Sequence, residues 1–222
     1  MKTNTFEPSP ENKAKAKNFR IISLIAWLLA MGGQIFAILN LIKNETLIWL
    51  LVVMWVILML SIVGSFFWKK ANRLDPASEK EKIKFFIQNQ LGAIIGVLVF
   101  LPLVIFIFIN KDVNKKTKGL AAGVGVIALI IAGATGVDFN PPSIEKYSEE
   151  INKQTNTLKT INHNNDAVFW TKAGNKYHID KDCQHIKGRE SISNGSVKKS
   201  WEQKGISELC KTCEKRVRKN EL

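Results

Sequence analysis

The sequence predicts an all-α transmembrane bundle of four helices, followed by a small α+β zinc-binding domain at the C-terminus. Two observations lead to this fold class. Four apolar segments without a charged residue occupy residues 21–137, and all three cysteines lie in the polar region that follows. The averages of the 222-residue chain, 46% hydrophobic and 23% charged, mix two unlike compositions. A single soluble globule and a disulfide-dense secreted module are therefore excluded.

Each of the four apolar segments is long enough to cross a bilayer. A helix needs about 20 mostly apolar residues to span a hydrocarbon core of roughly 30 Å. We expect spans at about residues 21–42, 47–68, 85–109 and 119–137. Residues 1–20 form a polar N-terminal segment. No small-x-small cleavage signal lies before the second span, so we expect the first helix to be retained.

The second span carries signals of the bilayer interface. Trp49 and Trp68 lie near its two ends, where amphipathic aromatic side chains are favoured. Further along, Asp75 followed by Pro76 is typical of a helix N-cap and first helical position. We therefore expect a helix over Ala77–Gln90 that runs along the interface and leads into the third span.

The fourth span is rich in glycine and contains Gly119, Gly123, Gly125, Gly133 and Gly136. Gly119 and Gly123 form a small-xxx-small pair, which allows two helix backbones to approach closely in lipid. We expect a packing face here, either within the chain or in self-association between copies. The alternative is a glycine-rich helix that packs on its neighbours without choosing a partner. No ionisable residue lies in any span, which counts against a transporter but not against a passive oligomeric pore.

The basic residues predict that both termini lie on the cytoplasmic side of the cell membrane. Lys and Arg near a span favour that side. They are frequent in residues 1–20 and 69–84, whereas the first loop contains only Lys43. The third loop, residues 110–118, is also basic and fits this topology poorly. If Pro102 turned the third span into a re-entrant hairpin, that loop would lie inside and the C-terminal domain outside.

The polar half begins with an expected linker over residues 138–166, a stalk or a solvated helix. Residues 167–171 are β-branched and aromatic, and with residues 176–178 they predict a β-hairpin. Ser196 is placed to cap a short helix that ends at Gly205.

The C-terminal domain, residues 167–222, contains a pattern of metal ligands. The predicted ligands are His178, Cys183, Cys210 and Cys213, spaced as His-x4-Cys-x26-Cys-x2-Cys. Thiolates and imidazole suit tetrahedral Zn²⁺, and a Cys-x2-Cys turn brings two thiolates to one ion. We therefore predict one structural zinc, whose binding would compensate for a small core.

A redox or disulfide use of the cysteines is an alternative to zinc. A redox pair of Cys210 and Cys213 would leave Cys183 without a role, and an odd number of cysteines argues against a disulfide framework. Cysteines without a shared role are a further alternative. His185 is a second candidate in place of His178, and His163 is expected to be solvated.

A longer pattern surrounds the ligands. It consists of Phe169-Trp170-Thr171-Lys172, Gly174-Asn175-Lys176-Tyr177-His178, Cys183, Gly205 and the final pair of cysteines. Residues 167–216 thereby resemble the metal-binding domain of the Ada DNA-repair methyltransferase, and related short modules are appended to bacterial nucleases and membrane proteins. The resemblance implies zinc and a bacterial source. Ada uses four cysteines, one of them a methyl acceptor, so the histidine here does not imply methyl transfer.

The membrane half carries a second resemblance. Phe100-Leu101-Pro102 is followed by Lys115-Lys116-x-Lys118. This arrangement is similar to a double-helix membrane unit of small Gram-positive membrane proteins.

Two function classes fit these features. The first is an interaction or scaffold protein, anchored in the lipid bilayer, that presents a zinc-stabilised module to a protein or nucleic-acid partner. The alternative is an oligomeric pore or membrane effector with a sensing C-terminal domain. An enzyme is not expected, because no Ser-His-Asp set, paired acids, Walker loop or open three-ligand zinc site is present.

The basic residues of the C-terminal domain leave its partner open. They are Lys198, Lys199, Lys204, Lys211, Lys215, Arg216, Arg218 and Lys219. Acidic residues interrupt them, so a solvated face or an anionic leaflet competes with nucleic acid.

Overall fold

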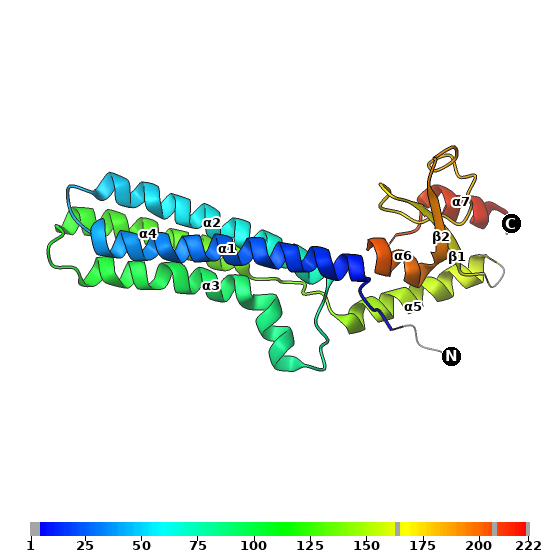
Figure 1. Ribbon diagram of the computed structural model, residues 1–222, viewed down its shortest axis with the longest axis horizontal. Helices are drawn as coiled ribbons and strands as arrows, with labels where there is room; N and C mark the ends of the chain where they lie inside the picture. Colours follow the sequence, from blue (N-terminus) through cyan, green and yellow to red (C-terminus); the bar gives the residue numbers. More distant parts are fainter. Residues whose placement is uncertain (1–4, 163–164, 206–207, 221–222) are drawn as a thin grey trace. The chain divides into compact units, whose positions relative to one another are not determined.

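The computed structural model describes residues 5–162, 165–205 and 208–220, and the chain forms two compact units (Figure 1). The membrane unit consists of Lys15–Arg73 and Lys80–Pro141. The polar unit consists of the described residues of Met1–Ala14, Leu74–Glu79 and Pro142–Leu222. The polar unit therefore combines three stretches that are far apart in the sequence.

Four long helices contribute most of the membrane unit. They are α1 (Pro10–Asn40), α2 (Leu47–Leu74), α3 (Lys82–Ile109) and α4 (Lys115–Gly136). All four are long and apolar enough to cross a membrane, in agreement with the four expected spans. Large apolar side chains such as Leu28, Leu39, Ile48 and Ile130 are exposed on their outer faces. Such faces suit contact with lipid rather than water.

Helix α3 is continuous, although Pro102 lies inside it. The alternative of a re-entrant hairpin is therefore wrong. Its first turns, drawn in teal in Figure 1, point away from the rest of the helix.

The start of α3 also corrects an expectation. Asp75 and Pro76 do not begin a helix, and the helix expected over Ala77–Gln90 begins only at Lys82. The cause is a competing backbone pairing within the polar unit, since the amide of Ile144 donates to the carbonyl oxygen of Ala77 at 3.2 Å.

The close contact between α3 and α4 uses glycines other than the expected pair. A Cβ at Gly136 would overlap the backbone of Gly92, and one at Gly96 would lie 3.0 Å from the carbonyl carbon of Ala132. By contrast, a Cβ at Gly119 or Gly123 would meet nothing within 4 Å. Among the described residues, nothing therefore packs against the face expected at those two glycines.

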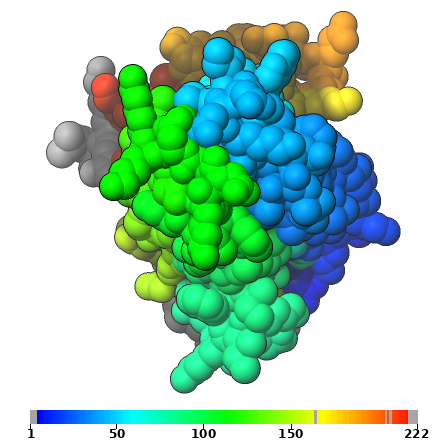
Figure 2. Space-filling view, turned by 90° about the vertical axis from the view of Figure 1, so that its left-hand side faces the viewer, coloured from blue at the N-terminus to red at the C-terminus, as the bar shows by residue number. Residues whose placement is uncertain are grey.

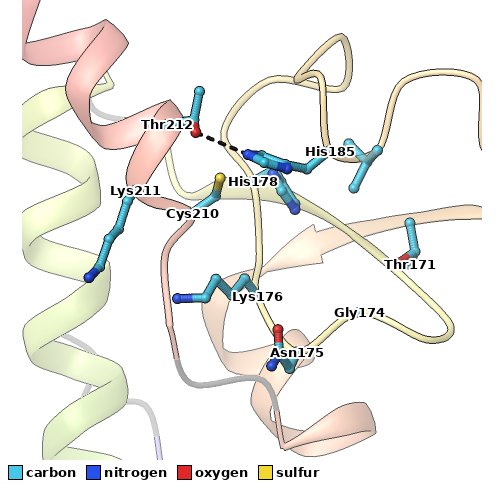
Figure 3. Close-up of a pocket in the computed structure, with 10 residues that line it drawn as sticks. Thr171, Gly174, Asn175, Lys176, His178, His185, Cys210, Lys211 and Thr212 are labelled. Carbon is cyan, nitrogen blue, oxygen red and sulfur yellow. Dashed lines mark hydrogen bonds between the residues drawn. The ribbon is translucent and has the colours of Figure 1, made fainter.

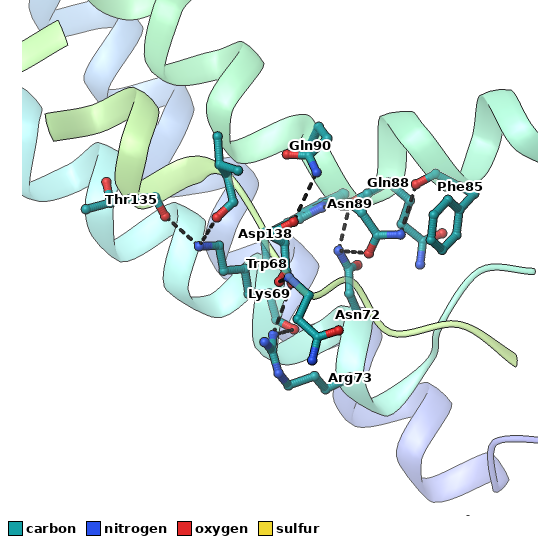
Figure 4. A network of polar contacts seen from close by, with 12 residues as sticks. Trp68, Lys69, Asn72, Arg73, Phe85, Gln88, Asn89, Gln90, Thr135 and Asp138 are labelled. Carbon is teal, nitrogen blue, oxygen red and sulfur yellow. Dashed lines mark hydrogen bonds and ion pairs between the residues drawn. The ribbon is translucent and has the colours of Figure 1, made fainter. Parts of the chain in front are cut away.

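A polar network joins α2 to α3 and to the end of α4 (Figure 4). The indole N–H of Trp68 and the side-chain amide of Asn72 donate to the carbonyl oxygen of Gln88, at 2.6 and 2.7 Å. Nearby, Arg73 forms an ion pair with the buried carboxylate of Asp138 at 3.3 Å. These contacts satisfy polar groups where the helices leave the charge-free segments.

The opposite end of the bundle is closed by its two loops. The side chain of Asn44 donates to the carbonyl oxygen of Asp112 at 3.1 Å and accepts from the amide of Asn114 at 2.9 Å. Figure 2 looks onto this end, where the blue and green side chains meet without a central opening. The described residues of a single bundle thus offer no channel on this face.

The polar unit has a core built from distant parts of the chain. The expected linker at residues 138–166 contains helix α5 (Ile144–Ile161), capped by the side chain of Ser143. Ile151 and Leu158 on α5 are fully buried, and Phe6 joins them from the N-terminal segment. The two stretches expected as a linker and a polar N-terminal segment therefore both contribute core side chains.

The small sheet differs from the expected hairpin. Strand β1 (Ala167–Thr171) pairs antiparallel with β2 (Ile192–Ser196), in the register Phe169 to Asn194. On the other edge of β1, residues 176–178 form only an isolated bridge, from Phe169 to His178. The expected pairing of residues 167–171 with 176–178 is therefore confirmed at this bridge alone, and the main partner of β1 is β2.

Two helices complete the polar unit. Helix α6 (Val197–Lys204) begins at Ser196, whose side chain accepts from the amide of Lys199, and ends at Gly205 in the left-handed conformation. The expected short helix is therefore confirmed. Helix α7 (Lys211–Asn220) follows the last bridge of the domain.

Candidate metal centre

The four predicted ligands lie together in the polar unit. The ligand atoms of His178, Cys183, Cys210 and Cys213 are all within 4.8 Å of one another, and all four residues are buried. The sulfur of Cys213 is 3.7 Å from Nδ1 of His178. Tetrahedral zinc with Zn–S of about 2.3 Å and Zn–N of about 2.0 Å would separate two such atoms by about 3.5 Å. The cluster therefore has the dimensions of one metal site.

Backbone pairing positions His178 beside Cys210. The amide of His178 donates to the carbonyl oxygen of Phe169 and its own carbonyl accepts in return, both at 2.7 Å. One residue earlier, the carbonyl oxygen of Tyr177 accepts from the amide of Cys210 at 2.9 Å. Strand β1 thus positions His178, and the segment of His178 positions Cys210. Cys210 is the first cysteine of the turn Cys210–Cys213, which we call the knuckle.

A tight turn presents Cys183. Its amide donates to the carbonyl oxygen of Asp180 at 3.2 Å, and its own carbonyl accepts from the amides of Ile186 and Lys187. Cys183 is fully buried in a cluster with Ile186. The turn therefore carries the thiol inward although the neighbouring residues are exposed.

The knuckle Cys210 to Cys213 forms the N-terminus of α7. Burial raises the pKa of Cys210, but hydrogen bonds from the backbone amides of Cys213 and Thr212 outweigh it, so the pKa lies below its ordinary value. Amides and the positive end of a helix stabilise a thiolate in this way. Burial raises the pKa of Cys213 to about 12. The pKa is therefore lowered for one sulfur of the knuckle and raised for the other.

The histidines take different places, as Figure 3 shows. His178 is buried within the cluster, and burial, followed by the proximity of His185, lowers its pKa. A neutral imidazole is the form that binds a metal. His185 is exposed, and its Nε2 lies 3.1 Å from the hydroxyl oxygen of Thr212. Of the two candidates, His178 therefore belongs to the cluster.

Apolar side chains shield one side of the cluster from water, and an open hollow lies on another side. Apolar side chains pack against the ligands, among them Ile179, Ile186 and Leu209. A hollow of about 400 Å³ lies beside the site, lined partly by Lys176, Lys211 and the exposed His185 (Figure 3). The ligands are thus enclosed while a polar surface remains next to them.

No protein-family model, curated protein or solved structure matches this chain.

The sequence indicates the four candidate ligands but not the groups that position them. Thr212 stands between the two cysteines of the knuckle and holds His185 outside the cluster. The Tyr177 carbonyl, which fixes Cys210, gives no signal in a sequence because it is a backbone group. The expectation for His163 lies outside the described residues.

Proposed function

We propose that this chain is a multi-pass protein of the cell membrane whose polar unit is a zinc-stabilised interaction module. The observation that carries the proposal is the buried group of one imidazole and three thiols on one centre. This donor set suits Zn²⁺ better than the hard cations Mg²⁺ and Ca²⁺, which prefer oxygen ligands. The metal would act in folding, since all four tetrahedral positions are taken by side chains and none is left for a catalytic water.

The metal would have a structural role because few other contacts fix the segments that carry the candidate ligands. The segment between Cys183 and β2 has turns rather than regular structure, and His178 is attached to the sheet by a single bridge. A metal ion that ties the turn, the bridge and α7 together would convert binding free energy into folding free energy. A binding or scaffold role, rather than an enzymatic one, is the function that we propose for such a module.

Contacts within the polar unit support the inference that its three stretches lie on the same side of the membrane. The amide of Phe6 donates to the hydroxyl of Ser148 at 2.9 Å, and the side chain of Glu145 accepts from the amide of Glu79 at 2.8 Å. The N-terminal segment, the loop between α2 and α3, and the C-terminal part would thus lie on one face of the membrane. We assign that face to the cytoplasm, because two of these stretches adjoin the most basic flanks and because a reducing compartment preserves the thiols.

The experiment that tests the proposal uses the full chain in detergent. Zinc should be found at one ion per chain, and Cys210→Ser should remove it. Thr212→Ser is the matched control, because Thr212 lies in the same knuckle without belonging to the cluster. Full zinc content in the Cys210→Ser protein, or none in the parent, would refute the metal assignment.

A further inference from the structure

The membrane unit contains a groove that no part of the proposal above uses. It has a volume of about 1050 Å³ and is formed by Arg20 of α1, Trp68 of α2 and residues 80–91 around the start of α3. All of its lining belongs to the membrane unit. The teal turns of α3, which point away from the rest of that helix in Figure 1, form one of its walls.

The lining divides into an apolar part and a basic part. Ile83, Ile87 and Leu91 recur at helical spacing along one wall, and Ile83 is 78% exposed. Four basic residues also line the groove, Arg20, Lys80, Lys82 and Lys84. Glu81 is the one acid of the lining, and it forms an ion pair with Lys84 at 2.9 Å. The groove thus combines an apolar wall with a net positive charge.

Two contacts organise the groove. The guanidinium carbon of Arg20 lies 6.0 Å from the centre of the Trp68 ring, within reach of a cation–π interaction. The N–H of the same ring donates to the carbonyl oxygen of Gln88 on α3. The wall from α2 therefore connects the basic residue of α1 to the apolar wall of α3.

The position of the groove along the chain matches the edge of the hydrocarbon core. Lys84 is the last charged residue before the charge-free run that begins at Phe85, and Trp68 directly precedes two lysines. Aromatic rings and lysines in such places mark the headgroup level of a bilayer. A ligand here would meet positive charge at its headgroup and apolar side chains where its acyl chain begins.

We propose that this groove binds an anionic glycerophospholipid. The phosphodiester would be attracted by the basic residues, and one acyl chain would lie along Ile83, Ile87 and Leu91. A free inorganic anion gains nothing from contact with the apolar wall. A zwitterionic lipid carries its own ammonium group, which the basic residues repel. The groove therefore selects by charge and by amphipathic shape together.

The test measures lipid retained by the full chain in detergent, with phosphatidylglycerol and phosphatidylcholine as probes in native mass spectrometry. Phosphatidylglycerol should be retained preferentially. The double variant Lys80→Gln with Lys82→Gln should weaken its retention by about 25-fold, since each basic residue near a lipid surface contributes about fivefold. Lys115→Gln with Lys116→Gln, a matched pair outside the groove, should leave retention unchanged.

A second variant tests the apolar wall. Ile87→Ser should reduce retention of phosphatidylglycerol, whereas Ile130→Ser at an exposed site on α4 should not. Glycerol phosphate, which has the charge without the chains, should not compete. Equal retention of both lipids, or competition by glycerol phosphate, would overturn the proposal. So would equal retention of phosphatidylglycerol by the double variant in the groove and by the control double variant. Because the groove shares no residue with the metal centre, removal of zinc by a chelator should leave this selectivity intact.

Discussion

The rings of Phe6 and Tyr147 meet edge to face, with their centres 5.1 Å apart and their planes at 89°. Tyr147 in turn packs on Trp201 of α6 at 5.2 Å. The N-terminal segment is thus part of the same core as the domain that carries the His/Cys cluster, although 141 positions separate Phe6 from Tyr147 in the chain. This relationship has consequences for both stability and topology.

Phe6→Ala should destabilise the polar unit by about 3 kcal/mol, because it removes a nearly fully buried aromatic side chain and leaves a cavity. The loss should appear as faster hydrogen exchange in α5 and α6 of the full chain. Phe139→Ala is the control, since Phe139 is 84% exposed. Unchanged protection in the Phe6→Ala protein would contradict the shared core.

The fragment 167–222 should not fold stably even with zinc, because Ile151 and Leu158 of α5 are missing from its core. The longer fragment 142–222 restores both side chains, each worth about 2–5 kcal/mol when fully buried. Denaturant unfolding of the two fragments in zinc should therefore be cooperative only for the longer one. Cooperative unfolding of the shorter fragment would show that the metal and the sheet suffice.

The topology can be tested by labelling single introduced cysteines with a membrane-impermeant maleimide. Glu45→Cys, in the loop between α1 and α2, should react in intact cells. Glu149→Cys, on the exposed face of α5, should react only after permeabilisation. The native cysteines are buried and provide a low background. Reaction of Glu149→Cys in intact cells would place the polar unit outside.

Gly136→Ala should lower the thermal stability of the membrane unit in detergent, because the added methyl group would overlap the backbone of Gly92 and Ala93. Overpacking of this kind costs about 1–3 kcal/mol. Gly123→Ala should be neutral or stabilising, since open space surrounds that position and alanine favours helix. If both variants melted alike, the close approach of α3 and α4 would be in doubt.

The sequence was most informative where one physical requirement dominates. A membrane span needs a long run without charge. For most of the helix ends, the expected position therefore lies within a few residues of the observed one. Two ends differ more, because α1 begins at Pro10, well before the apolar run at residue 21, and α2 ends at Leu74, six residues after Trp68. The four residues of the candidate metal site could be selected because thiolate chemistry restricts which residues hold a metal, and the structure brings those four side chains together.

The remaining features depend on tertiary contacts. Strand β2 reads Ile-Ser-Asn-Gly-Ser, which has neither alternating apolar residues nor β-branched enrichment, so only its pairing with β1 makes it a strand. Helix α5 has a polar composition that masks the buried residues Ile151, Thr155 and Leu158 of its inner face. The sequence shows that α4 contains many glycines. Which of these glycines face α3 depends on how the helix is rotated about its axis, and the sequence does not specify that rotation.

The most direct test of the central claim is the zinc content of the full chain purified in detergent without added metal, compared with that of His178→Ala and His185→Ala. We expect one zinc per parent chain, a large loss in the His178→Ala protein, and full content in the His185→Ala protein, because His178 alone of the pair lies in the buried cluster. A parent chain without zinc, or equal losses from both histidine variants, would contradict the metal centre described here.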